Sequence, residues 1–158
     1  MSPDLVVRQC TDGDLAALEQ NEPPRSGIAS YLLHQQAAGN IVYVAAWRDH
    51  QVLGTVVLDL RSDYTPELKH LYVQEAPRNA GVGTALCTWA ERHATRAGFG
   101  KLYLGVGVEN HGARRLYRRL GFTFTGQTTT TTYQYVDSDG RKQWATETDD
   151  IFEKALAE

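Results

Sequence analysis

The middle of the chain alternates twice between strand and helix, and this order constrains the fold more than any other feature of the sequence. An apolar run at Leu68–Val73 precedes one helical pattern, and a second apolar run at Leu102–Val108 precedes another. The residues sharing one face of the first helical pattern are Leu86, Trp89, Ala90, His93, Ala94 and Ala97, and Gly98 is expected to end it. Because a strand–helix–strand unit joins parallel strands, we expect a parallel strand pair at the centre of a sheet.

The segments on either side of this region predict antiparallel strands instead. Ile41–Trp47 and Val52–Leu60 are separated by a polar turn and form a predicted hairpin. Phe122–Val136 and Trp144–Leu156 flank an Asp- and Gly-containing segment that suits a tight turn. With shorter helical patterns near the N-terminus, the sequence predicts a mixed, mostly antiparallel α/β sheet flanked by about four helices.

Composition limits the class of protein. The chain has 158 residues, of which 42% are hydrophobic and 22% are charged, so we expect residues 1–158 to form a single globular domain. The net charge of -3 argues against a nucleic-acid partner. No apolar run approaches the ~20 residues that cross a bilayer and no signal sequence is recognisable, which favours a cytoplasmic protein without a membrane partner. Cys10 and Cys87 are not spaced as zinc ligands, so we expect reduced core cysteines and no metal.

A glycine-containing loop, Arg78-Asn79-Ala80-Gly81-Val82-Gly83, lies directly between a predicted strand and a predicted helix. Glycine lets backbone N–H groups approach a ligand, and a helix N-terminus favours negative charge, so such a loop suits a pyrophosphate. Glycines in a strand-to-helix turn also serve purely steric needs. The loop lacks the third glycine of a dinucleotide fingerprint and the Gly-Lys-Ser/Thr ending of a P-loop, which disfavours both of those motifs.

A second motif follows the next predicted strand and reads Asn110-x-x-Ala113-x-x-Leu116-Tyr117-x-x-x-Gly121-Phe122. Together with Arg78-x-x-Gly81-x-Gly83 and the preceding Glu67-Leu68-x-x-Leu71-Tyr72-Val73, it resembles the GCN5-related N-acetyltransferase (GNAT) family. The motifs run from about Glu67 to Phe122, and the expected elements on both sides agree with the GNAT fold. The resemblance implies an enzyme that moves an acetyl group from acetyl-CoA, as co-substrate, to a primary amine by direct transfer in a ternary complex.

The resemblance also implies roles for individual side chains. Tyr117 matches the acid that protonates the departing CoA thiolate, although its helix face would equally suit a core aromatic residue. Glu67 matches a glutamate that accepts the amine proton through water, and an exposed strand-end carboxylate is the alternative reading. His70 and Glu75 are weaker candidates for the base, since strand alternation puts His70 on the face opposite Glu67 unless a bulge intervenes.

The same resemblance implies which residues bind acetyl-CoA. Backbone N–H groups of Leu71–Val73 are expected to reach the thioester carbonyl, where negative charge develops during transfer. Asn110 is expected to contact the pantetheine arm or neighbouring backbone. The full predicted cofactor-binding set is Leu71, Tyr72, Val73, Arg78, Asn79, Ala80, Gly81, Val82, Gly83, Thr84, Asn110 and Tyr117.

The acceptor is less constrained than the cofactor. The acidic balance, with residues such as Asp59, Glu67 and Asp150, favours a polyamine, an aminoglycoside-like molecule or another small primary amine. A protein or peptide acceptor is the alternative, because the same motifs serve both classes. A non-catalytic acyl-CoA-binding regulatory module is a third reading, against which Tyr117 and Glu67 count. A homodimer is compatible with the resemblance, but no interface can be identified from the sequence.

Overall fold

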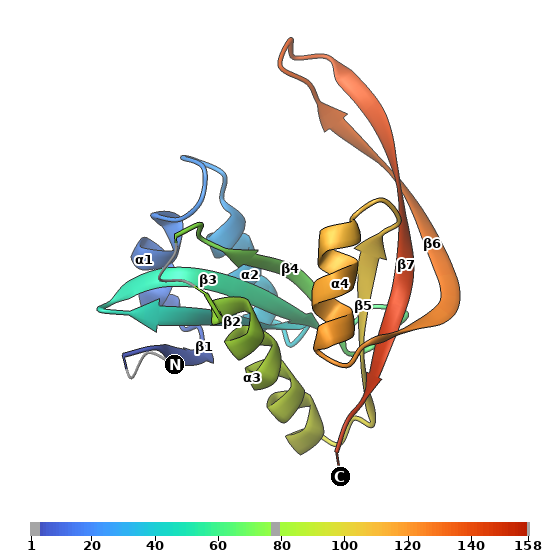
Figure 1. Ribbon diagram of the computed structural model, residues 1–158. Coiled ribbons are helices and arrows are strands. Elements are labelled where there is room, and N and C mark those ends of the chain that lie inside the picture. Colours follow the sequence, from blue (N-terminus) through green and yellow to red (C-terminus); the bar gives the residue numbers. More distant parts are fainter. Residues whose placement is uncertain (1–3, 77–79, 158) are drawn as a thin grey trace. The chain divides into compact units, whose positions relative to one another are not determined.

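The computed structural model describes residues 4–76 and 80–157 (Figure 1). The chain divides into two compact units. Unit 1 comprises Met1–Leu102 with Ala155–Glu158, and unit 2 comprises Tyr103–Lys154. The expectation of one domain stays a prediction. Across the described residues there are seven strands and four α-helices, which agrees with the number of helices expected. None of the helices in these residues has the length and apolarity that crossing a bilayer requires.

Unit 1 contains four antiparallel strands that neighbour one another in chain order. They are β1 (Val6–Gln9), β2 (Ile41–Arg48), β3 (Gln51–Asp59) and β4 (Glu67–Val73). The predicted hairpin is confirmed as β2 and β3, and their turn residues Asp49 and His50 adopt positive φ angles of 51° and 65°. The near-continuous burial of β2 and β3 shows that both faces of the sheet are covered.

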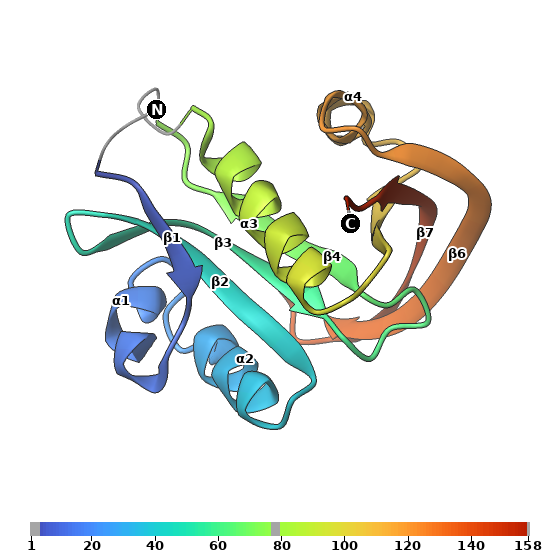
Figure 2. The same cartoon turned by 90° about the horizontal axis from the view of Figure 1, so that it is seen from below.

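Helices cover the two faces of this sheet (Figure 2). The short helices η1 (Asp12–Asp14) and α1 (Leu15–Glu19) lie with α2 (Ile28–Ala37) on one face, and α3 (Val82–Arg96) lies on the other. The core between the sheet and α1 and α2 contains Leu18, Ala29, Leu33, Tyr43, Ala45, Trp47 and Val57, in which alternate β2 residues point the same way.

The predicted helical face of α3 is confirmed in part. Val82, Leu86, Cys87, Ala90 and Ala94 are buried, whereas Ala97 lies at the exposed end of the helix. The helix ends as predicted before Gly98, whose φ of 91° is easily adopted by glycine. Cys10 and Cys87 are both buried and do not form a disulfide with each other, which agrees with the expectation of core cysteines.

Unit 2 contains most of β5 (Lys101–Gly107), α4 (His111–Arg119), β6 (Thr123–Val136) and most of β7 (Lys142–Ala155). The strand order is β5-β7-β6, and β6 and β7 form the predicted C-terminal hairpin. Its turn is held by Asp137, whose Oδ1 accepts the backbone N–H groups of Asp139 and Arg141 at 2.9 Å each. Phe122 and Phe152 of this unit are fully buried.

Candidate active site

A bulge interrupts β4 near its C-terminal end. The β3–β4 register pairs Thr55 with Tyr72 and Val57 with Lys69, so two β4 residues, His70 and Leu71, stand opposite one residue of β3. His70 has a φ of 55°, a left-handed conformation that few residues other than glycine adopt. A bulge of this kind redirects a side chain and leaves backbone groups outside the regular ladder.

The bulge decides which face of β4 His70 occupies. His70 and Lys69 line the same cavity, on the face covered by α2, although strict alternation would separate two consecutive residues. The sequence predicted that His70 would share the face of Glu67 only if a bulge intervened in the strand. The structure contains that bulge. Glu67 lies opposite Asp59 in the register, and Lys69 Nζ approaches both carboxylates on this face.

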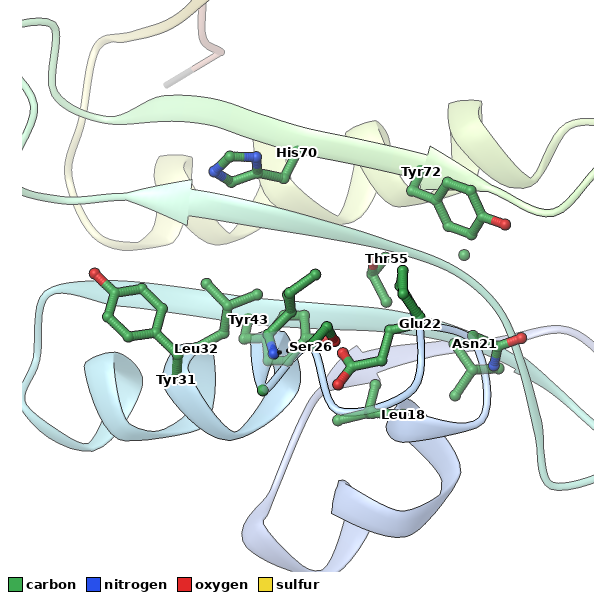
Figure 3. Close-up of a pocket in the computed structure, with 15 residues that line it drawn as sticks. Leu18, Asn21, Glu22, Ser26, Tyr31, Leu32, Tyr43, Thr55, His70 and Tyr72 are labelled. Atoms are coloured by element: carbon green, nitrogen blue, oxygen red, sulfur yellow. Dashed lines mark hydrogen bonds between the residues drawn. The ribbon is translucent and has the colours of Figure 1, made fainter. Parts of the chain in front are cut away.

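A large cavity of about 900 Å³ lies between this face of the sheet and the α1–α2 segment (Figure 3). His70 and Tyr72 reach it from β4, and Tyr31 and Leu32 reach it from α2. Most of the lining is apolar or aromatic; the described lining residues are Leu18, Asn21, Glu22, Pro23, Ser26, Gly27, Ile28, Tyr31, Leu32, Tyr43, Val52, Gly54, Thr55, His70 and Tyr72. Cavities of this size and lining accommodate small organic molecules.

Two polar side chains of the cavity wall are Glu22, which has a hydrogen-bond partner, and Tyr43, which is uncharged. Glu22 Oε2 accepts the backbone N–H of Ala29 at 2.9 Å, which places a carboxylate at the N-terminal turn of α2. Burial raises the pKa of the Tyr43 phenol well above its ordinary value, so Tyr43 is a neutral wall of the cavity.

A smaller cavity of about 350 Å³ adjoins the first one and shares Tyr31, Leu32 and His70 with it. It is more polar, because Asp59 and Lys69 form an ion pair there, with 2.9 Å between Lys69 Nζ and Asp59 Oδ2. Burial opposes the charge on Asp59, but the hydrogen bonds from Lys69 and from the Arg61 backbone outweigh it, and the pKa of Asp59 lies below its ordinary value. Asp59 is therefore an anion already matched by a cation.

Glu67, the predicted base, lies beside these cavities. Its carboxylate accepts a hydrogen bond from the Ser62 hydroxyl, and Lys69 Nζ stands 4.0 Å from its Oε1. Glu67 is not among the described residues that line either cavity, whereas His70 lines both. Glu75, the other weak candidate, is exposed beyond the end of β4. The structure thus brings His70, rather than Glu67 or Glu75, to the cavity wall.

The described part of the predicted pyrophosphate loop forms the start of α3. Gly81 is the residue before the helix, with a φ of 85°, and no atom would lie within 4 Å of a Cβ placed on it. The first intrahelical bond runs from the Ala85 N–H to the Gly81 carbonyl, so the N–H groups of Val82, Gly83 and Thr84 face forward from the helix. Within this helix no acidic residue occupies the first turn and no side chain caps the N-terminus. These features suit a bound phosphate.

Two residues of the predicted cofactor loop, Arg78 and Asn79, lie outside the described residues. The remaining loop positions, from Ala80 to Thr84, form one continuous turn and helix start. The predicted strand positions Leu71, Tyr72 and Val73 lie at the bulged end of β4.

The remaining predicted site residues belong to unit 2. Asn110 caps α4, since its Oδ1 accepts the backbone N–H of Ala113 at 3.1 Å. Tyr117 is half-buried, and its ring meets the edge of Phe122 with 6.0 Å between ring centroids. Arg114 forms an ion pair with Asp150, so this carboxylate, one of the acidic residues expected to favour an amine, is already paired with a cation. Both alternatives for Tyr117, core aromatic and acid, agree with this partial burial.

The sequence reasoning did not identify most of the individual residues that shape the large cavity. Glu22, Tyr31 and Tyr43 come from three separate elements or loops, and no spacing between them signals that they meet. The segment from Pro24 to Tyr31, which the resemblance implies as one that sets the choice of acceptor, does supply Ser26, Gly27, Ile28 and Tyr31 to the lining.

Comparison with known proteins gives consistent matches. The model of the acetyltransferase (GNAT) family matches residues 11–122. The chain is 34% identical over 86 residues to the probable N-acetyltransferase 14 of Xenopus tropicalis, a match covering 54% of this chain and 42% of that protein. It is 29% identical over 103 residues to the aminoalkylphosphonate N-acetyltransferase of Salmonella typhimurium, covering 62% of this chain and 64% of that protein. The matches therefore span less than two thirds of either relative.

Among solved structures, the chain is similar to a GNAT family acetyltransferase from Elizabethkingia anophelis with acetyl-CoA bound. The TM-score is 0.67 at 20% sequence identity, and the match covers 98% of this chain and 100% of that one. At this identity the likeness shows the fold, and it confirms the predicted mixed α/β fold class.

Proposed function

Because the chain belongs to the acetyltransferase (GNAT) family, we propose that it transfers an acetyl group from acetyl-CoA to the primary amine of a small molecule. The observation that carries this proposal is the arrangement of β4. One strand carries a bulge at the wall of an organic-molecule-sized cavity and then leads toward the glycine-started N-terminus of α3. The strand that lines the acceptor cavity and the helix that starts at the phosphate-binding turn are thus consecutive elements of the chain.

The proposed cofactor contacts follow from the described backbone. The N–H groups of Val82, Gly83 and Thr84 would bind the pyrophosphate of acetyl-CoA, with Gly81 leaving room for its oxygens. His70 and Leu71 have no register partner on β3, which supports a role for backbone N–H at the bulge in binding the thioester carbonyl. Arg78, Asn79 and Asn110 remain proposed contacts on the strength of the motif alone.

The proposed transfer is direct, in a ternary complex. The neutral amine nitrogen attacks the thioester carbonyl carbon, the carbon–sulfur bond breaks, and the products are an amide and CoA. A general base removes the proton that the ammonium form carries, and Tyr117 donates its hydroxyl proton to the departing thiolate. The proton that the attacking nitrogen loses as the amide forms then returns to the Tyr117 oxygen, so the tyrosine hydroxyl is restored. Its partial burial against Phe122 fixes the ring while leaving part of the side chain accessible.

Two residues of β4 compete for the role of base. Glu67 is the first candidate from the motif and would act through water, held by Ser62. His70 is favoured by position, because it lines both cavities and needs no relay to reach an amine there. The variants Glu67→Gln and His70→Asn separate them: loss of the base lowers kcat by about 10²-fold or more with acetyl-CoA affinity unchanged. The variant that keeps its kcat excludes its residue.

A small-molecule acceptor is supported by the size and mostly apolar lining of the cavity, and the Salmonella relative is named for a small amine substrate. The test is calorimetric titration with acetyl-CoA, followed by thiol release on a panel of amines and peptides. Micromolar binding with amine-dependent thiol release is expected. Thiol release with peptides alone would indicate a protein or peptide acceptor. Acetyl-CoA binding without thiol release across the panel would favour a regulatory acyl-CoA-binding module. Absence of acetyl-CoA binding would refute the proposal.

A further inference from the structure

We propose that the acceptor is a monoamine with an apolar body, such as an arylalkylamine. This inference rests on the proposed acetyl transfer and narrows its substrate class. It excludes the polycationic acceptors among those that the acidic net charge favoured. The chain as a whole is acidic, whereas the described lining of the cavity is mostly apolar and aromatic.

The walls of the large cavity are suited to an apolar group. Leu18, Leu32 and Val52 supply aliphatic surface, and the rings of Tyr31, Tyr43 and Tyr72 supply aromatic surface. Three of the lining residues are large and apolar yet strongly exposed: Ile28 at 47%, Tyr31 at 62% and Tyr72 at 52%. Exposed apolar side chains gathered around one opening mark a binding site for an apolar partner, since their burial is favourable only when something covers them.

The charges around the cavity do not suit a polyamine. Glu22 is the one carboxylate among the described lining residues, and it already accepts the Ala29 N–H at the positive end of α2. In the adjoining cavity, Asp59 is paired with Lys69, which also approaches Glu67. A molecule with three or four ammonium groups would lose hydration on entry without finding matching unpaired carboxylates.

The position of His70 orients the acceptor. It stands where the two cavities meet, at the bulge of β4, so an amine directed toward it leaves the carbon body in the large apolar cavity. A second polar substituent on the acceptor would lie in the smaller cavity beside the Asp59–Lys69 pair. One nitrogen and one apolar body therefore account for the large cavity and for its junction with the smaller one.

The test compares acceptors of graded apolarity by acetyl-CoA-dependent thiol release. The probes are n-alkylamines from propylamine to octylamine, 2-phenylethylamine, and spermidine as a polycation of similar length. We expect kcat/KM to rise by about fourfold per methylene until the cavity is filled. The value for 2-phenylethylamine should exceed that for spermidine by about tenfold or more. A flat alkyl series, or a preference for spermidine, overturns the inference while leaving the proposed acetyl transfer intact.

Two variants link the preference to the cavity. Ile28→Ala and Tyr31→Ala remove exposed lining side chains, so the fold should survive. Each should lower kcat/KM for 2-phenylethylamine by about tenfold without changing acetyl-CoA affinity. Tyr135→Ala is the matched control, since Tyr135 is 45% exposed on β6 and is not among the described lining residues. An equal loss in the control overturns the assignment to the cavity.

Calorimetry keeps the two proposals distinguishable if no thiol is released. Titration of 2-phenylethylamine into the protein measures the cavity without the cofactor. Binding that Tyr31→Ala weakens supports the inferred ligand class, even if the absence of acetyl-CoA binding refutes the acetyl transfer. No detectable binding of 2-phenylethylamine, alongside normal acetyl-CoA binding, overturns the inference alone.

Discussion

The close approach of β3 to β4 makes Gly54 the most sensitive backbone position beside the cavity. A Cβ added at Gly54 would lie 2.6 Å from the Tyr72 carbonyl oxygen, and 3.3 Å from both Val73 Cα and Leu86 Cδ1. The oxygen belongs to the backbone of a paired strand and cannot rotate away, so β3 and β4 must separate by several tenths of an ångström. Overpacking of this kind costs about 1–3 kcal/mol, and contact with backbone places Gly54→Ala at about 2–3 kcal/mol.

Gly100→Ala is the matched control for this substitution. A Cβ at Gly100 would meet no atom within 4 Å, and its φ is not in the left-handed region, so alanine should be neutral or stabilising by up to about 1 kcal/mol. For a chain of this length each kcal/mol shifts Tm by about 2–4 °C, so Gly54→Ala should lower Tm by about 5–10 °C. Thermal and urea unfolding followed by circular dichroism measure both.

The activity of Gly54→Ala should change as well as its stability. Gly54 lines the large cavity, and the β4 residue paired with it directly follows Tyr72, at the end of the bulge. Separation of the two strands would therefore move the cavity wall and should raise KM for the amine. Equal stability of Gly54→Ala and Gly100→Ala would refute the reasoning, because it would mean that β4 does not pack against β3 as closely as described.

Three further predictions concern the cofactor, the acid and a structural ion pair. Gly81→Glu should abolish acetyl-CoA binding, because it places negative charge at the start of α3. Gly81→Asn should still bind acetyl-CoA, because asparagine tolerates the φ of 85°. Equal acetyl-CoA affinities of the two variants, measured by calorimetry, would reject the loop assignment. Tyr117→Phe should keep acetyl-CoA affinity and lower kcat by about 10²-fold, and unchanged turnover removes Tyr117 from the mechanism. Arg8 Nη1 donates a hydrogen bond to Asp14 Oδ2 at 2.8 Å, and this bond lowers the pKa of Asp14 to about 2. Asp14→Asn should therefore cost about 1 kcal/mol at pH 7 after screening, and the cost should vanish as pH falls from about 4 to about 2; urea unfolding showing a pH-independent difference would contradict it.

The elements of the fold could be predicted because their signals are local. The helical spacing from Leu86 to Ala94 and the stop at Gly98 lie within a single segment, and the structure reproduces both. The bulge at His70 could not be predicted, because alternation assumes regular pairing and the extra residue is defined only by the partner strand. Tyr31 and Tyr43 meet at the cavity through the packing of α2 on β2, which no spacing records.

The difference between the two halves of the site has a physical cause. A phosphate-binding turn requires a particular backbone conformation next to a helix start, so it needs glycine at fixed positions such as Gly81, and a short motif can report it. An acceptor cavity requires volume and apolar surface, which many residue types supply from many elements, so no motif reports it. The motif therefore identifies the donor that the chain shares with its family, while the acceptor must be inferred from walls such as Tyr31 and Tyr72 and from the bulge that turns His70 toward them. It follows that alkylamine chain length, which acts only on those walls, tests the structure more directly than substitution of any motif residue.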